Sequence, residues 1–411
     1  MSPETPTRRS DKRATIQSGD PSNWRERQVI KRLDRLHTGR LEVRLPNGST
    51  AIFEGDSEGP AACLYMHSAA MVTRLFKAGS VGFAEGYMAG EWDADNLATL
   101  IYLLHLNEAA LEPDFSRLQH LYTWMSAIRH RLRRNSKRGS RRNIAYHYDL
   151  GNDFYAQWLD ETWTYSSAIF AHEDEPLVEA QQRKYARLLE RLDVQPGDHI
   201  LEIGCGWGGF ARYAATHADC YVTGLTLSTE QLRFAQERAE AAGLSDRVSF
   251  ELRDYRDVST RYDHVVSIEM YEAVGEAYWP TYFAAIHDAL KPGGRAAIQA
   301  ITIDDSRFEY YRANVDFIQE YIFPGGMLAS PSVFQAQADA QGLHARVTDF
   351  YGADYARTLM RWDASVRAAS ESIITARGSS FYRMWRYYLA YCAAGFTSGN
   401  IDLMQIALQR D

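Results

Sequence analysis

The chain has 411 residues but only four cysteines (Cys63, Cys205, Cys220 and Cys392), whose spacing fits neither a metal site nor a disulfide framework. Their small number fits a reducing cytoplasm. No apolar run approaches the roughly 20 residues that a membrane-spanning helix needs. The first residues, MSPETPTRRSDKR, lack the apolar core of a signal peptide. We therefore expect a cytoplasmic protein that is either soluble or attached to a membrane surface.

An excess of basic charge is also absent. The chain has 53 acidic side chains against 45 Lys and Arg, a net charge of -8, which argues against a dedicated nucleic-acid-binding protein. The exception is the stretch 129–142, RHRLRRNSKRGSRR, in which eight residues are Lys or Arg and none is acidic. This stretch suits either a solvated linker or a surface attracted to anionic lipid headgroups, which need only the charge. Nucleic acid would also need stacking or groove-reading side chains, and we identify none.

The length suggests two domains, and the composition indicates where they divide. Residues 1–23 are polar and basic and are expected to be disordered. Residues 24–108 indicate a small α+β domain with a β-hairpin at 41–53. Four closely spaced glycines after the hairpin predict turns. Residues 109–142 are expected to form a linker, and 143–411 a larger catalytic domain.

The stretch 200–209, ILEIGCGWGG, has the pattern of a strand, a tight turn and the start of a helix. Gly204, Gly206 and Gly209 satisfy G-x-G-x-x-G, which alone is a weak signal shared by dinucleotide and other adenosyl-cofactor sites. Such glycines let the backbone turn sharply and let a ligand approach closely. Glu202, just before the turn, favours a positively charged cofactor such as S-adenosylmethionine (SAM) over a phosphate group.

An alternation of strands and helices follows this turn and predicts a doubly wound, Rossmann-like parallel sheet. Ligands bind such sheets at the carboxyl ends of the strands. The residues expected at those ends are Gly204, Thr226, Asp254 and the segment 269–272. The strands are expected at 220–225, 248–252, 264–269 and 295–303.

The end of the second strand separates two cofactors. A nicotinamide dehydrogenase needs an acid about 20 residues beyond the glycines, to bind the ribose hydroxyls. That place is occupied by GLTLS at 224–228, which is hydroxylic and has no acid. Asp254 and Tyr255, after the next strand, suit an adenine, with a carboxylate for the amino group and a ring for stacking. Together these residues favour SAM over a dinucleotide.

Nine sequence blocks follow one another in order along residues 143–411. They are YHYDLGNDFYAQWLD (146–160), YSSA (165–168), LEIGCGWGG (201–209), TGLTLSTEQ (223–231), RDYRD (253–257), MYEAVG (270–275), FIQEYIFPGG (317–326), YARTLMRW (355–362) and FYRMWRYYLAYCAAGF (381–396). Together these blocks resemble the cyclopropane-fatty-acyl-phospholipid synthase family of SAM-dependent fatty-acid methyltransferases. In the front domain, GFAEGYMAGEWD (82–93) also resembles longer bacterial members of that family.

The resemblance implies a methyltransferase fold with a helical, aromatic-rich substrate cap, for which the insertion at 304–343 is the candidate. It also implies a SAM site. Glu202 is a further candidate for that site, because it lies directly before the glycine turn. The cofactor-binding residues that it implies are Tyr165, Ser166, Gly204, Gly206, Thr226, Leu227, Gln231, Asp254, Tyr255 and Arg256.

The resemblance implies the family's reaction, in which a methyl group is transferred to an alkene. A bound bicarbonate ion then removes a proton, and a cyclopropane ring closes. A cysteine, a glutamate, a histidine and a tyrosine hold that ion. Here Ser167 stands for the cysteine and Gln299 for the histidine, while Glu272 and Tyr321 remain. Bicarbonate is therefore a doubtful ligand, although Ser167 and Gln299 can both hydrogen-bond an anion. Glu272 is the candidate for proton abstraction or cation stabilisation, and Tyr321 for orienting an anion or shielding the cation.

These departures favour methylation without ring closure, which gives a methyl-branched alkene or a methylene group that a partner reductase could saturate. A cyclopropane synthase, a non-catalytic lipid-binding protein and a nicotinamide oxidoreductase stay open as alternatives. The expected substrate is an unsaturated acyl chain of a phospholipid, reached from the inner face of an anionic membrane. The resemblance also suggests a homodimer and a partner reductase or oxidase, and no nucleic-acid partner is expected.

Charge reversal of the Lys and Arg residues in 129–142 tests the membrane hypothesis. We expect the full-length variant to bind anionic phospholipid vesicles more weakly than the unchanged protein. The difference should shrink as salt rises, because salt screens exposed charges. Co-sedimentation with anionic vesicles measures the effect, with neutral vesicles as the control. Equal binding of both proteins would show that the stretch is only a linker.

Overall fold

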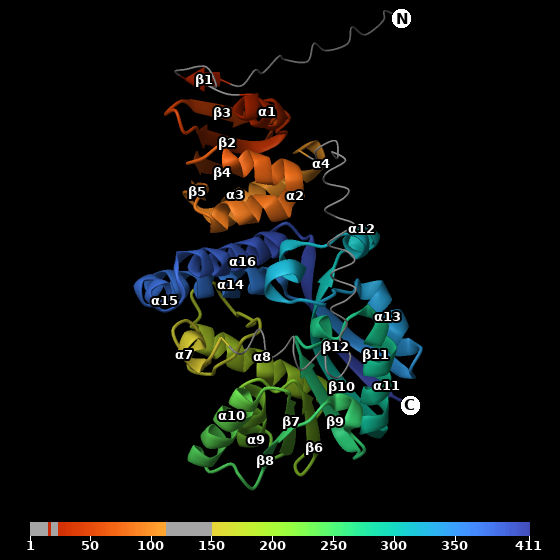
Figure 1. The fold of residues 1–411 in the computed structure, drawn as a ribbon. Coiled ribbons are helices and arrows are strands. Elements are labelled where there is room, and N and C mark those ends of the chain that lie inside the picture. Colours follow the sequence, from red (N-terminus) through yellow and green to blue (C-terminus); the bar gives the residue numbers. More distant parts are fainter. Residues whose placement is uncertain (1–14, 18–23, 112–149) are drawn as a thin grey trace, which may run out of the picture. The chain divides into compact units, whose positions relative to one another are not determined.

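The computed structural model describes residues 15–17, 24–111 and 150–411. Contacts within it divide the chain into two compact units, Met1–Gln119 and His120–Asp411 (Figure 1).

Several predicted segments lie partly or wholly outside the described residues. The basic stretch 129–142 lies wholly outside them, as do residues 146–149 of the first catalytic-domain block. Within the N-terminal segment that was expected to be disordered, Thr15–Gln17 forms a strand and pairs with Thr50–Ile52 of the hairpin.

The first unit is built on a five-stranded sheet in the order β1-β3-β2-β4-β5. The expected hairpin is confirmed, because β2 and β3 pair antiparallel from Arg40 opposite Glu54 to Arg44 opposite Thr50. The described elements are β1 (Thr15–Gln17), α1 (Trp24–Leu33), β2 (Thr38–Arg44), β3 (Thr50–Glu54), β4 (Ser57–Met66), α2 (Ala70–Met88), β5 (Trp92–Ala94), α3 (Leu97–Leu106) and α4 (Glu108–Leu111).

The glycines that predict turns in this unit lie mostly within one helix. α2 spans three of the four, and only Gly79, with a φ of 57°, departs from helical geometry. Gly82 allows the backbone after this kink to pack closely on the part before it. A Cβ atom at Gly82 would lie 2.0 Å from the carbonyl oxygen of Arg74. The turn prediction is wrong at Gly82 and Gly86, which serve close packing within the helix, and it is confirmed at Gly90, which lies in a turn with a φ of 72°.

The second unit contains a seven-stranded sheet in the order β11-β12-β10-β9-β6-β7-β8. The strands from β8 to β10 are parallel, as predicted for a doubly wound sheet, but β12 runs antiparallel to both β10 and β11. Side-chain alternation does not reveal strand direction, so the sequence could not show this. The strands are β6 (His199–Ile203), β7 (Tyr221–Thr226), β8 (Val248–Leu252), β9 (Tyr262–Ile268), β10 (Leu290–Ile303), β11 (Leu343–Phe350) and β12 (Ile401–Arg410).

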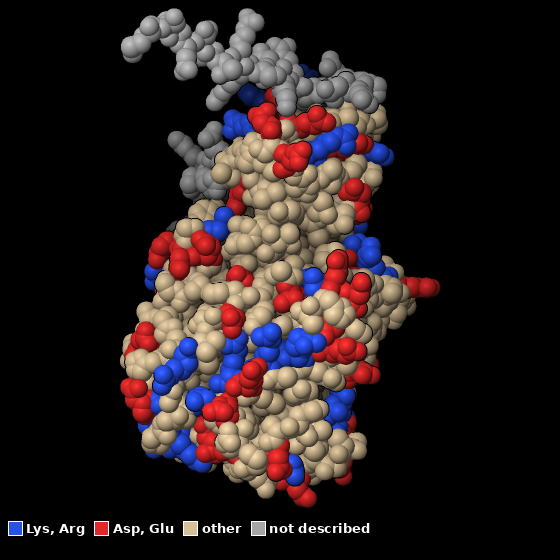
Figure 2. All heavy atoms as spheres, turned by 180° about the vertical axis from the view of Figure 1, so that it is seen from behind, with Lys and Arg blue, Asp and Glu red and all other residues tan. Residues whose placement is uncertain are grey.

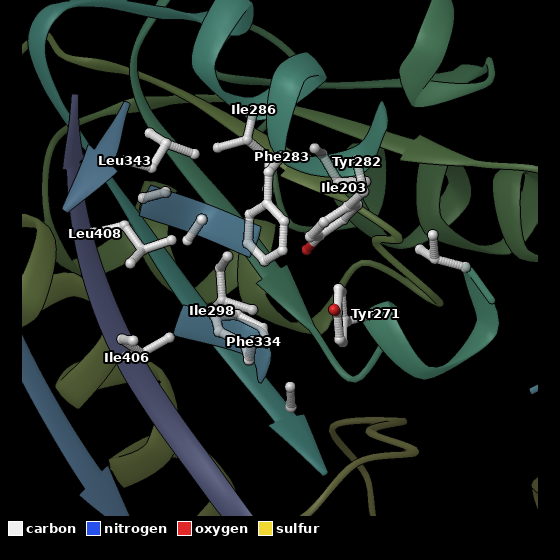
Figure 3. Packing of buried hydrophobic residues seen from close by; sticks show 14 of the residues in the cluster. Ile203, Tyr271, Tyr282, Phe283, Ile286, Ile298, Phe334, Leu343, Ile406 and Leu408 are labelled. Atoms are coloured by element: carbon white, nitrogen blue, oxygen red, sulfur yellow. The ribbon is translucent and has the colours of Figure 1, made fainter. Parts of the chain in front are cut away.

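Helices cover both faces of this sheet. On one face, Phe283 and Phe334 lie over Ile298 and Leu408 (Figure 3). Because side chains alternate along a strand, Gln299 points to the opposite face from Ile298. The helices of the first face are α11 (Trp279–Ala289) and α13 (Pro331–Asp339), and those of the opposite face are α8 (Leu177–Leu192), α9 (Gly209–His217) and α10 (Thr229–Ala241).

The predicted insertion lies between β10 and β11, as expected, and carries short helices. These are α12 (Phe308–Ala313) and a π-helix (Ile318–Ile322), which precede α13. A second helical layer lies between β11 and β12 in the sequence. It was not predicted as part of the cap. It consists of α14 (Gly352–Ala368), α15 (Ser370–Arg377) and α16 (Ser379–Thr397).

The last helix packs against the insertion, as expected. Phe317, just before the π-helix, has its ring centroid 4.8 Å from that of Tyr387 and 6.2 Å from that of Tyr391, both in α16. The short helix α7 (Asn152–Tyr155) adds Phe154, whose ring lies edge-on to Trp385 at 4.9 Å. Aromatic contacts therefore join the insertion to α16, and α16 to α7.

Among the described residues, no helix combines the length and apolar character that crossing a bilayer requires. On the face drawn in Figure 2, basic side chains gather across the middle of the catalytic unit and acidic side chains flank them. This face therefore presents charges of both signs rather than a broad basic surface.

Candidate active site

The glycine loop lies at the carboxyl end of β6, where the strand order reverses between β6 and β9. Gly204, Gly206 and Gly208 have positive φ angles of 84°, 52° and 80°. Gly209 begins α9, and a Cβ atom there would lie 2.6 Å from the hydroxyl of Tyr185. The predicted strand, turn and helix are confirmed, and the first two motif glycines supply the turn while the third supplies close packing.

Thr226 ends β7 and is tied to the helix that follows it. Its hydroxyl donates to Oε1 of Gln231 at 2.9 Å and accepts from the backbone N–H of Ser228 at 3.1 Å. Nε2 of Gln231 is buried and has no hydrogen-bond partner among the described residues. Leu227 lies half-buried between them. A buried amide donor without a partner is uncommon, so this end of β7 fits a ligand that accepts a hydrogen bond.

The corner after β8 is pre-formed by an ion pair. The carboxylate of Asp254 accepts from Nε and Nη2 of Arg256 at 2.8 and 2.7 Å and from its backbone N–H at 3.0 Å. The ring of Tyr255 lies edge-on to Tyr282, with centroids 5.7 Å apart. Asp254 and Arg256 therefore hold each other in place. Tyr255 lies between them in the sequence and is a candidate stacking surface for an adenine.

Glu202 lies beneath the glycine loop and is only 3% exposed. Its Oε2 atom is buried without a hydrogen-bond partner among the described residues. Burial raises the pKa of its carboxyl to about 8, although the charge of Lys184 and the backbone N–H of Ala211 oppose that rise. Because a nearby positive charge would favour its ionised form, Glu202 fits the expected cationic cofactor.

Tyr165 and Ser166 lie together before α8. Tyr165 donates a hydrogen bond from its hydroxyl to that of Tyr388 at 2.8 Å, and its ring lies 5.4 Å from that of Trp362. The hydroxyl of Ser166 accepts from Nζ of Lys184 at 2.7 Å. Lys184 is fully buried, and burial lowers its pKa to about 7 against the opposing charges of nearby acids. This lysine thus places the Ser166 hydroxyl beside a group of buried carboxyls.

Ser167 and Gln299, the two altered anion-site residues, meet at the carboxylate of Glu269. The backbone N–H of Ser167 and Nε2 of Gln299 each donate to its Oε1 atom at 2.8 Å. The hydroxyl of Tyr355 donates to its Oε2 atom. The hydroxyl of Ser167 donates instead to the carbonyl of Ala168 at 2.9 Å. The structure therefore brings Ser167 and Gln299 together, but around Glu269, whose role as their acceptor was not predicted.

Glu272 follows three residues later. Its Oε1 atom accepts from the backbone N–H of Ile301, while Oε2 is buried without a partner among the described residues. Burial raises the pKa of Glu272 to about 8, and the charge of Glu269 adds to the rise. Two carboxyls this close oppose each other's ionisation. At neutral pH, Glu272 is therefore mostly protonated.

Tyr321 lies in the π-helix of the cap and is half-buried. Its ring stacks on that of Phe317, with centroids 5.4 Å apart and planes at 29°. The ring thus packs within the cap, and its predicted role toward an anion or a cation stays a prediction.

Two residues of this site, Lys184 and Tyr355, were not predicted from the sequence, and Glu269 was predicted only as part of the segment 269–272 at the ligand-binding ends of the strands. Lys184 gave a signal, because it stands four residues from Ala180 and Leu188 on the apolar face of α8, where a charge is unexpected. Glu269 also gave one, as an acid directly after a buried strand. Tyr355 gave none, since only the fold brings it to the carboxylate.

The chain is similar to known proteins over most of its length. A family model described as mycolic acid cyclopropane synthetase matches residues 135–406. The chain is 41% identical over 401 residues to the tuberculostearic acid methyltransferase UfaA1 of Mycobacterium tuberculosis, covering 93% of this chain and 91% of that one. It is 38% identical over 342 residues to the cyclopropane-fatty-acyl-phospholipid synthase of Escherichia coli K12, covering 82% and 85%.

A solved structure shows the same fold. The mycolic acid cyclopropane synthase CmaA1, complexed with SAH and CTAB, superposes with a TM-score of 0.62 at 32% sequence identity. The superposition covers 66% of this chain and 98% of that chain.

Replacement of Gln231 by Glu tests the cofactor site. The variant keeps an acceptor for Thr226 but exchanges the buried N–H donor for an oxygen, so we expect about tenfold weaker SAM binding. Isothermal titration calorimetry with SAM measures the affinity. Gln236→Glu, the same change at an exposed position of α10, is the control and should bind normally. Equal affinity of both variants would remove Gln231 from the site.

Proposed function

Because the chain belongs to the mycolic acid cyclopropane synthetase family and is a SAM-dependent lipid methyltransferase, we propose that it makes a methyl-branched acyl chain rather than a cyclopropane. Its substrate on this proposal is the double bond of an unsaturated fatty acyl chain in a membrane phospholipid. The relative UfaA1, whose name is that of a methyltransferase, aligns with 93% of the chain and supports this choice.

The observation that carries the proposal is the surroundings of Gln299. Its Oε1 atom accepts from Nε2 of Gln405 at 2.8 Å, and its own Nε2 donates to Glu269. An amide neither takes up nor releases a proton in the physiological range, whereas a histidine at this place could do both. The site therefore lacks the histidine that the family resemblance implies as a ligand of the bicarbonate base, which disfavours ring closure.

We further propose that the residues implied by the family resemblance hold the cofactor. Gln231 and Glu202 support this, because each has a buried polar atom without a partner among the described residues. The glycine loop leaves open space beside Gly206, where a Cβ atom would meet nothing within 4 Å. The remaining members of the proposed SAM site are Tyr165, Ser166, Gly204, Thr226, Leu227, Asp254, Tyr255 and Arg256.

SAM supplies the methyl group: the alkene π electrons form the new C–C bond as the C–S bond breaks, and positive charge is left on the neighbouring chain carbon. The aromatic rings around Tyr165 can stabilise such a cation through their faces. Trp158 and Trp362 lie 5.3 and 5.4 Å from the Tyr165 ring. Loss of a proton from a carbon next to the cation then gives a methyl-branched alkene. A hydride shift before that loss gives a methylene group, which a partner reductase could saturate.

A protein that takes an acyl chain from a bilayer must approach its surface, so we propose attachment to the inner face of an anionic membrane through the basic stretch 129–142. A homodimer would place two such stretches on one membrane. The runner-up function is cyclopropane formation, which the 38% identity with the E. coli synthase favours.

Lipid analysis of a host with and without the gene tests the product. A ring and a methyl-branched alkene have the same mass, because each adds one carbon and two hydrogens. We therefore expect the new species to take up hydrogen under conditions that saturate alkenes, and to fragment at a methyl branch. A host that carries an empty vector is the control. A new species that resists hydrogenation, with a ring located by fragmentation, would overturn the proposal in favour of cyclopropanation.

A further inference from the structure

We propose that the side chain of Glu269 is a built-in anion that fills the place where the family binds bicarbonate and that accepts the proton lost by the substrate. The inference rests on the proposed function for the nature of that substrate. It concerns a residue that the sequence motifs did not single out.

The hydrogen bonds of Glu269 carry the argument. Its carboxylate accepts from three donors, and two of them, Ser167 and Gln299, stand at positions where the family resemblance implies ligands of the ion. The third donor is the hydroxyl of Tyr355. A carboxylate has about four lone-pair positions. With two donors on Oε1 and one on Oε2, the free position lies on Oε2.

The backbone at Glu269 shows that this placement carries a cost. Its φ angle is +50°, which is uncommon for any residue other than glycine. Such a conformation is strained and persists only where the surroundings hold it. The backbone N–H of Glu269 donates to the backbone carbonyl of Gln299 at 2.8 Å, and the Glu269 carboxylate accepts from the side-chain Nε2 of the same glutamine. Strain kept at the end of a central strand indicates a functional side chain.

The surroundings of Glu269 and Glu272 favour Glu269 as the ionised one of these two carboxyls. Burial raises its pKa, but the charge of Lys184 and the three hydrogen bonds oppose the rise. The carboxyl of Glu272 has one backbone donor, and its pKa is about 8. Of two coupled carboxyls, the one with more donors keeps the charge. With three hydrogen-bond donors against one, Glu269 is therefore the better placed of the two carboxyls to carry the negative charge.

A bicarbonate ion does not fit the residues of this site. The backbone N–H of Ser167 and the amide of Gln299 already donate to Glu269, and the hydroxyl of Ser167 donates to Ala168. A second anion there would face an ionised carboxylate and a second buried carboxyl, Glu272. Like charges in a buried site repel strongly, so free anions are excluded.

The proton transfer balances without another reactant. A C–H bond beside the cationic carbon breaks, and its electron pair becomes the π bond of the product. The proton passes to the free lone pair on Oε2 of Glu269, which becomes neutral. Release of that proton to water restores the carboxylate before the next turnover.

Two replacements of Glu269 test the proposal. Glu269→Gly removes the anion and leaves a residue that accepts the positive φ, so we expect the fold to persist. Its SAM-dependent formation of SAH on unsaturated phospholipid vesicles should fall by about 100-fold in bicarbonate-free buffer, and added bicarbonate should restore it in part. Glu269→Gln fills the same space without charge. It should lose activity to a similar extent and gain nothing from bicarbonate.

The unchanged enzyme should show equal turnover with and without bicarbonate. Glu276→Gln, which removes a carboxylate that pairs with Arg312 outside this hydrogen-bond set, is the matched control and should behave the same way. SAH binding and thermal unfolding check that each variant is folded.

A binding measurement keeps the test independent of the substrate. In NMR with carbon-13-labelled bicarbonate, only Glu269→Gly should bind the ion, and the unchanged enzyme and Glu269→Gln should not. Bicarbonate binding or bicarbonate-dependent turnover in the unchanged enzyme would overturn the proposal. A folded Glu269→Gly protein that does not bind the ion would also overturn it. An absence of turnover on the vesicles, with the expected binding pattern, would count against the proposed substrate and leave the built-in anion supported.

Discussion

The catalytic unit depends on a single carboxylate that joins parts of the chain far apart in sequence. Glu269 at the end of β9 accepts hydrogen bonds from Ser167 before α8, from Gln299 in β10 and from Tyr355 in α14. These bonds tie the central sheet to the segment in front of it and to the helical layer. Removal of the carboxylate would take an acceptor from three donors, of which Nε2 of Gln299 would keep the carbonyl of Ser167 at 3.4 Å.

The position of that carboxylate depends in turn on a chain of neutral amides. Gln299 and Gln405 stand opposite each other in β10 and β12, and both are fully buried. Gln405 donates to Oε1 of Gln299, which leaves only the NH2 group of Gln299 to face Glu269. At the far end of this chain of hydrogen bonds, Nε of Arg191 donates to Oε1 of Gln405 at 3.1 Å. The antiparallel strand β12, absent from the sequence prediction, thus fixes which end of Gln299 the active site meets.

Local signals in the sequence predicted the parts of the site that are built locally. The glycine turn and the Thr226 to Gln231 segment each lie within a few residues, so their chemistry follows from their spacing. The role of Glu269 could not be predicted in this way. Its partners Ser167 and Tyr355 are 102 and 86 residues away, and no spacing rule reports such contacts. For the same reason the sequence identified Ser167 and Gln299 as altered without showing what had replaced the lost ligands.

Three buried carboxyls of the candidate site share one nearby cation. Glu202, Glu269 and Glu272 all have raised pKa values, and Lys184 is the cation whose charge acts on the first two. At the proposed SAM site, the sulfonium would add a second positive charge and lower the cost of ionising these acids. Binding of SAM at that site and release of protons from it would then favour each other. SAH lacks the sulfonium charge, so the same carboxyls would hold it less strongly than SAM.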